Sequence, residues 1–163
     1  MASQKKRKIK VVTIHDNFFK LFDDNSDPEL LTIKEEMHRR PCLVLIKIKY
    51  KNKKYTFALP LRSNISYHAP KNTYFALPTR STTRDGNHHG IHYSKAFPVD
   101  SKYFLPYQMD GDFFGELVLA TIEKNIKTIV QDFQKYIERY ENGDMPKFCT
   151  DIDNAIMKQE LLK

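Results

Sequence analysis

The chain has 163 residues, about one domain, and 40% of them are hydrophobic, which is enough for a core without disulfide bonds or a structural metal. Lys and Arg number 27 against 20 Asp and Glu, a formal net charge of +7, which favours a polyanionic partner such as RNA or DNA. There is no signal peptide pattern, no apolar run long enough to span a membrane and no zinc spacing around Cys42 and Cys149, so we expect one soluble cytoplasmic domain over residues 1–163.

The chain begins with a predicted strand and a short helix. Residues 9–14 are β-branched and predict the strand. Asp16 is placed to cap a helix over 17–22, whose apolar side chains face inward. An acidic, turn-rich loop follows, and 28–37 predict a further helical turn that Pro41 ends.

Residues 42–50, CLVLIKIKY, predict the clearest strand, continuously apolar at first and then alternating. The alternation places Ile46, Ile48 and Tyr50 on one face and Lys47 and Lys49 on the other. Residues 51–54 predict a polar hairpin turn, and 55–60 the returning partner strand. Because proline cannot donate to a ladder, we expect Pro60 to end that strand.

A repeated segment draws attention to the ends of two strands. FALPLRS at 57–63 and FALPTRS at 75–81 differ only at their fifth position. Pro78 is expected to end a strand over 73–77 as Pro60 ends its own. If the two strands lie side by side with matching ends, Arg62, Ser63, Arg80 and Ser81 line one rim. Arginine offers a planar donor fork to phosphate, and serine can bond phosphate or ribose. Taken singly, each is an ordinary loop residue.

A polar loop over 81–90 contains two histidines, and a third follows it closely. His88, His89 and His92 allow three interpretations: a metal site, for which Asp85 is the one nearby carboxylate; a solvated loop; or acid–base chemistry near neutral pH. If residues 91–95 are extended, His92 and Ser94 share one face, and Tyr93 and Lys95 share the other.

The rest of the chain completes an α+β domain. Residues 91–99 and 102–107 resemble strands, and the DGD at 110–112 caps a long helix ended by Asn142-Gly143. Its apolar stripe recurs at spacings of three and four, at Ile122, Ile126, Ile129, Phe133, Ile137 and Tyr140. A final helix is expected at about 150–161. We predict a compact antiparallel, barrel-like sheet with helices around it.

These features fit metal-free RNA cleavage. In that reaction the 2′-hydroxyl attacks the adjacent phosphate, a base takes its proton, cations stabilise the phosphorane and an acid protonates the leaving 5′-oxygen. The candidate catalytic residues are Ser63, Arg62, His92 and Arg80. The candidate RNA-binding residues are Lys47, Lys49, Tyr67, Lys71, His88, His89 and Lys95. No Walker, GxGxxG, GxSxG or HExxH motif is present, and no cofactor is expected.

Three segments carry a resemblance to a known family. KVVTIHDNFFKLFDDNSDPELL, CLVLIKIKYKNKKYTFALPLRS and SKYFLPY, within roughly 9–140, resemble toxins of type III toxin–antitoxin systems, the ToxN/AbiQ/TenpN group. The resemblance implies a metal-independent endoribonuclease with an SH3-like barrel similar to MazF, PemK and CcdB, leaving a 2′,3′-cyclic phosphate and serving in phage defence. It also implies inhibition by a repeated RNA pseudoknot, with toxin and RNA alternating in a closed ring.

The same resemblance assigns one site residue. The family's catalytic serine follows the strand end and matches Ser63. The threonine before it is replaced by Arg62, and the lysine soon after it has no counterpart, since Asn64 and Ile65 stand there. Two other functions remain open: a non-catalytic RNA-binding module, and a barrel-fold toxin that acts on a protein target.

Overall fold

The computed structural model describes residues 9–22, 40–108 and 111–162. The predicted acidic loop and the helical turn over 28–37 lie outside these ranges. The strands are β1 (Val11–Ile14), β2 (Cys42–Tyr50), β3 (Lys53–Ile65), β4 (Tyr74–Leu77), β5 (His88–His92), β6 (Phe97–Pro98) and β7 (Phe104–Pro106). The helices are α1 (Asp16–Phe19), α3 (Phe113–Lys124), α4 (Ile126–Glu141) and α5 (Ile152–Glu160), with 3-10 turns η1 (Lys71–Thr73), η2 (Tyr93–Lys95) and η3 (Ser101–Tyr103).

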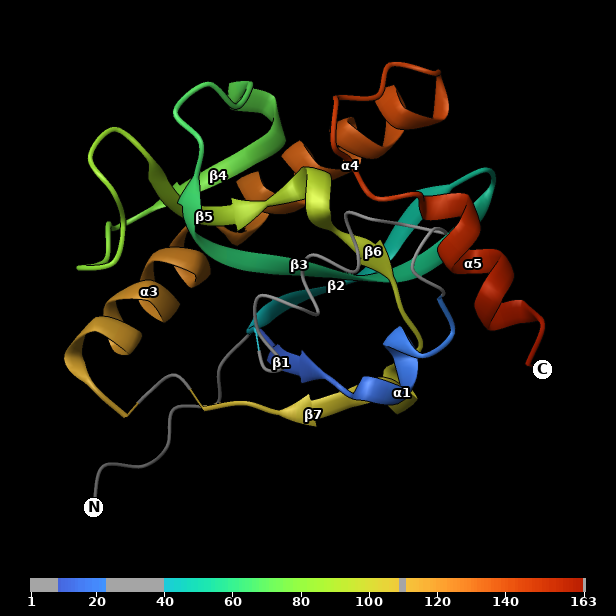
Figure 1. Cartoon of the computed structure of the whole chain (residues 1–163), viewed down its shortest axis with the longest axis horizontal. Helices are drawn as coiled ribbons and strands as arrows, with labels where there is room; N and C mark the ends of the chain where they lie inside the picture. The colour runs from blue at the N-terminus through green and yellow to red at the C-terminus, as the bar shows by residue number, and fades with distance from the viewer. Residues whose placement is uncertain (1–8, 23–39, 109–110, 163) are drawn as a thin grey trace.

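The strands form one antiparallel sheet in the order β4-β5-β3-β2-β1-β7, and β6 pairs with β3 beside this path. Figure 1 shows α3 and α5 at opposite sides of the view, with α4 running behind the sheet. The α+β class with an antiparallel sheet and surrounding helices is therefore confirmed. Among the described residues, no helix has the length and apolar character to cross a membrane.

The strand predicted over 42–50 forms, but a bulge interrupts its alternation. The pairing with β3 shifts between Leu45 and Ile48, and Lys47 has a positive φ of 59°. The extra residue reverses which face each side chain takes. Ile46 is consequently 62% exposed, while Ile48 and Tyr50 are buried. The prediction that Ile46 shares their face is wrong for this reason.

The hairpin turn is tighter than predicted. Only Lys51 and Asn52 separate the strands, both with positive φ, at 48° and 66°. Two successive left-handed residues make a type I′ turn, whose twist matches that of the flanking strands.

Pro60 does not end its strand, because β3 continues to Ile65. The amide of Leu61 donates to the carbonyl of Pro41 at 3.0 Å, on the β2 side. Alternation therefore places the Pro60 nitrogen on the opposite side. There the pairing with β6 stops at Ala58 and the pairing with β5 begins at Leu61. Pro60 thus lies between the stretch of β3 that pairs with β6 and the stretch that pairs with β5, where no backbone N–H is needed for pairing.

The two later strand predictions are only partly correct. Residues 91–99 are not one strand, because η2 separates the end of β5 from β6. In 102–107, the turn η3 precedes the three residues of β7. Residues 74–77 do form a strand that ends before Pro78, as expected.

The predicted long helix is two helices that share one apolar face. Asp112 caps α3 by accepting from the Gly115 amide at 2.6 Å, as predicted. Asn125 leaves helical geometry, with φ −110° and ψ 13°, and separates α3 from α4. Gly143, with φ 88°, follows the end of α4 and supplies the left-handed residue typical of that position. The predicted stripe is buried except at Ile126, which is half-buried.

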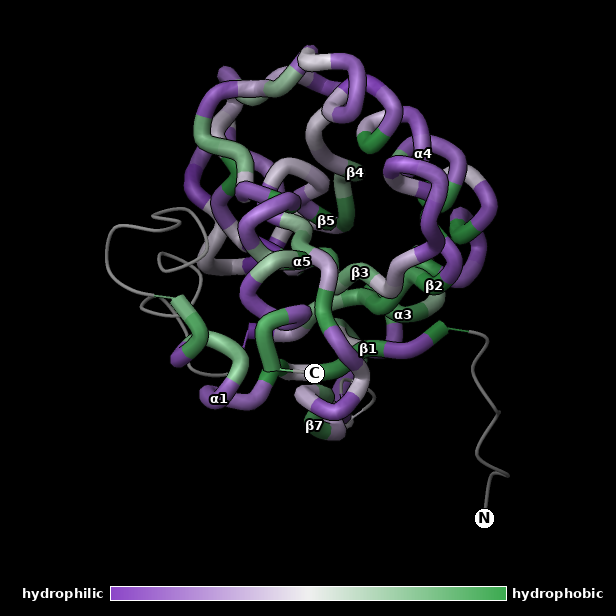
Figure 2. Tube along the Cα trace, turned by 90° about the vertical axis from the view of Figure 1, so that its right-hand side faces the viewer, coloured by the Kyte–Doolittle hydropathy of each residue, from purple (hydrophilic) through white to green (hydrophobic). Residues whose placement is uncertain are grey.

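The core lies on both sides of the central strands. The main cluster joins α3, α4 and α5 to strands β2 to β5, and Phe133 packs edge-on against Phe57. A second cluster joins α1 to β6, where Phe18 stacks on Phe97. Figure 2 shows hydrophobic segments at β1, β2 and β3, with hydrophilic chain around the outside.

The N-cap of α1 is His15, whose Nδ1 accepts from the Asn17 amide, and not Asp16 as predicted.

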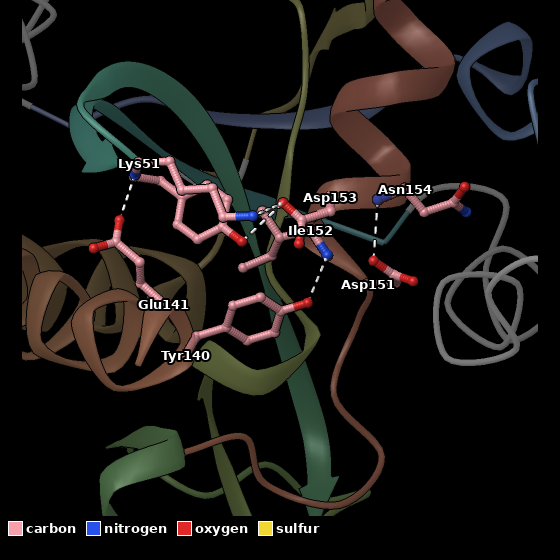
Figure 3. Close-up of polar contacts among 8 residues, drawn as sticks. Lys51, Tyr140, Glu141, Asp151, Ile152, Asp153 and Asn154 are labelled. Carbon is pink, nitrogen blue, oxygen red and sulfur yellow. Dashed lines mark hydrogen bonds and ion pairs between the residues drawn. The ribbon is translucent and has the colours of Figure 1, made fainter. Parts of the chain in front are cut away.

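The hairpin turn is tied to the C-terminal helices (Figure 3). The amide of Lys51 donates to the Glu141 carboxylate at the end of α4. Asp153 in α5 accepts from the Lys51 ammonium at 3.1 Å and from the Tyr50 hydroxyl at 2.9 Å. The Tyr140 hydroxyl accepts from the first amide of α5 at 3.1 Å. These bonds hold α4, α5 and the turn together at one end of the sheet.

Candidate nucleic-acid site

A cavity of about 600 Å³ is lined by the last residues of β3 and by His92, which ends β5. Its wall combines the end of β3, the 66–70 loop, the 92–95 segment and the connection between α4 and α5. The lining residues are Arg62, Asn64, Ile65, Ser66, His68, Ala69, Pro70, Thr73, His92, Ser94, Lys95, Pro146, Lys147 and Phe148. The size is within the range of about 300–1,000 Å³ typical of small-ligand sites. Three of the residues predicted for RNA chemistry, Arg62, His92 and Lys95, are therefore brought together.

Pairing between β3 and β5 sets the positions of these side chains. Arg62 lies opposite Gly90, and Ile65 lies opposite His88, with an irregularity between the two pairs. A Cβ on Gly90 would lie 2.4 Å from the Phe75 carbonyl oxygen of β4. Glycine thus permits the close approach of β4 to β5 at the level of Arg62.

Ser63 lies between two cavity residues without lining the cavity itself. It is half-buried, and its neighbours Arg62 and Asn64 both line the wall. The role that the resemblance assigns to Ser63 stays a prediction.

His92 occupies an unusual electrostatic position. It is 8% exposed, and its Nδ1 has no hydrogen-bond partner among the residues that the structure describes. Burial lowers the pKa of His92 to about 3, assisted by the positive charges of Arg62, Lys95 and Arg40. The imidazole is therefore neutral near pH 7 and carries an unsatisfied polar atom in a cationic setting.

The turn η2 places Ser94 and Lys95 in the same wall as His92. The extended backbone predicted for 91–95 is wrong, since residues 93–95 form a 3-10 turn that brings Lys95 to the cavity, while Tyr93 packs in the core with Ile91. The Lys95 ammonium donates to the carbonyl of Phe148 at 2.5 Å.

Sequence reasoning missed three residues of this site. Arg40 is buried, and its guanidinium donates to the Leu61 carbonyl at 3.1 Å, close enough to His92 to lower its pKa. Lys147 and Phe148 reach the cavity from the α4–α5 connection. Their positions depend on tertiary packing, and the sequence carries only the weak signal of a short polar link after Gly143.

The two Arg-Ser pairs do not share one rim. β5 lies between β3 and β4, so Arg62 is level with Gly90 and Ala76 and not with Arg80. Arg80 follows the end of β4, and its guanidinium lies 5.0 Å from the centre of the Phe114 ring. The expectation of neighbouring strands with matching ends is wrong, because the repeat ignores the extra strand between them.

The other two predicted histidines begin β5 and are not in a solvated loop. His89 is buried, and its Nδ1 lies 2.7 Å from the Pro78 carbonyl oxygen. Burial lowers the pKa of His89. His88 is half-buried and stacks on Tyr74, with ring centres 4.9 Å apart. The described residues contain no group of three or more His, Cys, Asp or Glu side chains that could hold a metal ion.

Tyr67 and Lys71 lie close in sequence to the cavity wall. Tyr67 is 62% exposed and packs against His68, with ring centres 3.9 Å apart. His68 lines the cavity, whereas Tyr67 itself does not. Lys71 is exposed at the start of η1.

Lys47 and Lys49 lie at the hairpin end, away from the cavity. Lys49 pairs with Lys54, and strands rise about 3.3 Å per residue, so Arg62 lies roughly 26 Å further along β3. The backbone of Lys49 is bound at both its amide and its carbonyl by the Gln134 side chain of α4. Both lysine side chains are exposed.

Comparison with known proteins gives a match in structure alone. No family model and no curated protein matches the chain. One solved structure, from bacterial type III toxin–antitoxin systems with selective toxin inhibition by a non-coding RNA pseudoknot, has a TM-score of 0.66 and 16% identity, covering 95% of this chain and 98% of that one. Another, from a bacterial antiviral system regulated by a processed non-coding RNA, has a TM-score of 0.65 and 13% identity, covering 93% and 97%. The predicted resemblance to type III toxin–antitoxin toxins is therefore confirmed at the level of the fold.

Proposed function

We propose that the chain is the toxin of a type III toxin–antitoxin system and acts as a metal-independent, sequence-selective endoribonuclease. The observation that carries the proposal is the grouping of His92, Arg62 and Lys95 in one cavity. A neutral imidazole among cations is suited to RNA, whose phosphate brings negative charge to the cations and whose neighbouring 2′-hydroxyl carries the proton to be moved.

The reaction follows from these residue types. A ribose 2′-hydroxyl attacks the adjacent phosphorus and gives its proton to a base, for which His92 is our candidate. Arg62 and Lys95 stabilise the negative charge of the phosphorane. The bond from phosphorus to the 5′-oxygen then breaks, and that oxygen takes a proton from water to complete cleavage. The products are a 2′,3′-cyclic phosphate and a 5′-hydroxyl.

We propose that the bound phosphate itself makes His92 a stronger base. In the free protein a pKa of about 3 makes His92 a weak base. A phosphodiester held between Arg62 and Lys95 places a negative charge beside the imidazole and offsets theirs. An opposite charge within about 4–6 Å favours the protonated form, so substrate binding raises the pKa of His92 and makes the imidazole a stronger base.

Ser63 enters through the resemblance and not through the cavity. Its hydroxyl is proposed to bond a phosphate or ribose oxygen of a strand that passes over the end of β3. Ser81, the matching residue of the repeat, is exposed in the loop after β4. It therefore provides a matched control, with the same side chain and the same preceding arginine.

The proposed partner in the cell is an RNA antitoxin. The two similar structures come from systems described by a non-coding RNA pseudoknot and by a processed non-coding RNA. By analogy, we propose that a repeated pseudoknot inhibits this chain in the cytoplasm, that toxin and RNA form a closed ring, and that the system serves in phage defence.

The test is cleavage of end-labelled RNA by the purified protein in EDTA, with the product ends mapped. We expect 2′,3′-cyclic phosphate ends for the wild type, and loss of cleavage for His92→Ala and Ser63→Ala. Ser81→Ala should retain full activity. Intact RNA that is nevertheless bound would replace the proposal with a non-catalytic RNA-binding module. Intact and unbound RNA would favour a toxin that acts on a protein target.

A further inference from the structure

Phe148 combines two features that packing does not explain. Its side chain is 72% exposed, although it lines the cavity that holds His92. Its backbone has a φ of +61°, in the left-handed region that bulky side chains rarely adopt. Neither feature serves the hydrophobic core. A strained backbone beside a cavity is a reason to look for a functional role.

Hydrogen bonds hold this backbone in place. The Phe148 carbonyl accepts from the Lys95 ammonium at 2.5 Å. Two residues later, the Thr150 amide donates to the Ser94 carbonyl at 2.9 Å, and the Thr150 hydroxyl donates to the carbonyl of Ala96. The segment that carries the phenyl ring is thus bonded directly to the wall that carries His92. The exposed ring is presented by a fixed backbone.

The surroundings favour a flat aromatic ligand that carries negative charge. Arg62, Lys95 and Lys147 line the same cavity as the phenyl ring. A nucleotide has both parts, an anionic phosphate and a base with a π face on each side. Aromatic side chains beside cationic grooves bind single-stranded RNA by stacking on its bases.

We propose that Phe148 is the stacking platform for a base of the substrate RNA, next to the phosphate held by Arg62 and Lys95. This inference rests on the proposed function and adds a residue that positions the substrate. The bond between Lys95 and the Phe148 carbonyl sets the distance between the phosphate contact and the base contact. The phenyl ring itself takes no part in the proton transfers.

The test uses the absence of tryptophan from the chain. Phe148→Trp introduces a single indole whose fluorescence reports stacking directly. The probe is a short RNA oligonucleotide of mixed sequence with 2′-fluoro sugars, which has no hydroxyl for the attack and so cannot be cleaved. Fluorescence anisotropy of the labelled oligonucleotide measures binding in parallel. Phe113→Trp is the matched control, because Phe113 is 85% exposed at the start of α3 and does not line the cavity.

We expect the oligonucleotide to quench the indole emission of Phe148→Trp and to leave that of Phe113→Trp unchanged. Phe148→Ala should weaken binding by about 5- to 150-fold, the range that corresponds to one stacked base. Phe148→Leu should weaken it nearly as much, since leucine is apolar but has no π face. Phe113→Ala should bind as the wild type does.

Three results would overturn the inference in different ways. If the oligonucleotide binds every variant equally and the emission of Phe148→Trp does not change, stacking is wrong while RNA recognition stands. If Phe148→Leu binds as the wild type does, the ring supplies apolar contact and not stacking. An oligonucleotide that binds no variant, the wild type included, would contradict the proposed function, and the stacking role with it.

Discussion

Two basic regions at opposite ends of β3 show how differently the same charges can be used. At the hairpin end, Lys47 and Lys49 on β2 and Lys51 in the tight turn are exposed. At the other end, Arg62 and Lys95 line a cavity with a buried histidine. The exposed lysines keep their water and are screened by salt, whereas the cavity cations act through partly desolvated space. The number of charges is therefore a poor guide to a site, and their surroundings decide the function.

The strongest test of this comparison removes the imidazole from the cavity. We expect His92→Ala to lower the rate of RNA cleavage by about 10²–10⁴-fold, because that is the usual contribution of one acid–base group. RNA binding, measured by anisotropy with the 2′-fluoro oligonucleotide, should change little, since the arginine and lysine remain. Equal cleavage by His92→Ala and the wild type would show that the cavity is not the reaction site.

The second test compares the removal of a cavity cation with the removal of a hairpin cation. Arg62→Ala should lower cleavage by about 10²–10³-fold, as loss of one transition-state donor does. Lys49→Ala should leave the cleavage rate within roughly twofold, because an exposed charge far from the phosphate contributes little. Arg62→Lys should recover part of the activity, since it restores the charge without the planar fork.

The salt dependence of RNA affinity shows whether Lys49 binds RNA without taking part in cleavage. If Lys49 contacts RNA backbone, Lys49→Ala should reduce the slope of log affinity against log salt by about one. The predicted RNA-binding role of the hairpin would then stand without a catalytic one. A larger effect on cleavage from Lys49→Ala than from Arg62→Ala would reverse the comparison between the two regions.

Local patterns predicted one of these regions better than the other. The strand over 42–50, its hairpin turn and the apolar stripe from Ile122 to Tyr140 depend on periodicity within one segment, and they formed nearly as expected. The sequence pattern did not predict the bulge at Lys47, because a bulge depends on how two strands pair and not on residue type.

The cavity depends on contacts between distant segments. Pro60 suggested a strand end, yet it occupies a gap between two partner strands, which a single sequence does not reveal. The burial of His92 and the approach of Arg40 and Phe148 likewise follow from packing. The sequence indicated Arg62, His92 and Lys95, which line one cavity, but the repeat indicated the wrong arginine as the companion of Arg62.

The third test uses pH to measure how buried His92 is. Its pKa falls from 6.5 in the unfolded chain to about 3 in the folded protein. Between these values the unfolded state binds the extra proton, so the free energy of unfolding falls as pH is lowered from 6.5 toward 3. At pH above 6.5 the histidine is neutral in both states and adds no pH dependence. The slope for one proton is about 1.4 kcal/mol per pH unit.

Urea unfolding of the wild type and of His92→Asn between pH 7 and pH 4 checks this slope. The wild type should lose stability more steeply on acidification, by up to that slope, because asparagine does not titrate. His89, whose pKa is also lowered by burial, acts with the same sign in both proteins and cancels from the difference. Parallel curves would mean that His92 is accessible to protons in the folded state.

The smallest effects are expected at the hairpin end, where bonds hold structure and not substrate. Tyr50→Phe removes a partly buried hydroxyl that donates to Asp153 at 2.9 Å, and should lower the free energy of unfolding by about 1 kcal/mol. Lys51→Ala removes an ammonium 3.1 Å from the same carboxylate, but both side chains of that pair are more than half exposed. Its loss should cost at most about 0.5 kcal/mol, because exposed ion pairs are weak.

Chemical denaturation of these two variants, with RNA cleavage measured alongside, completes the comparison. Tyr50→Phe should be the more destabilising, and both should cleave RNA at the wild-type rate, because the bonds that they remove lie at the far end of β3. If Lys51→Ala were the more destabilising, the Lys51–Asp153 ion pair would contribute more to the free energy of unfolding than is expected of an exposed pair. If either variant lost cleavage without losing stability, the hairpin would take part in the reaction, and the division between a structural end and a reactive end of the sheet would fail.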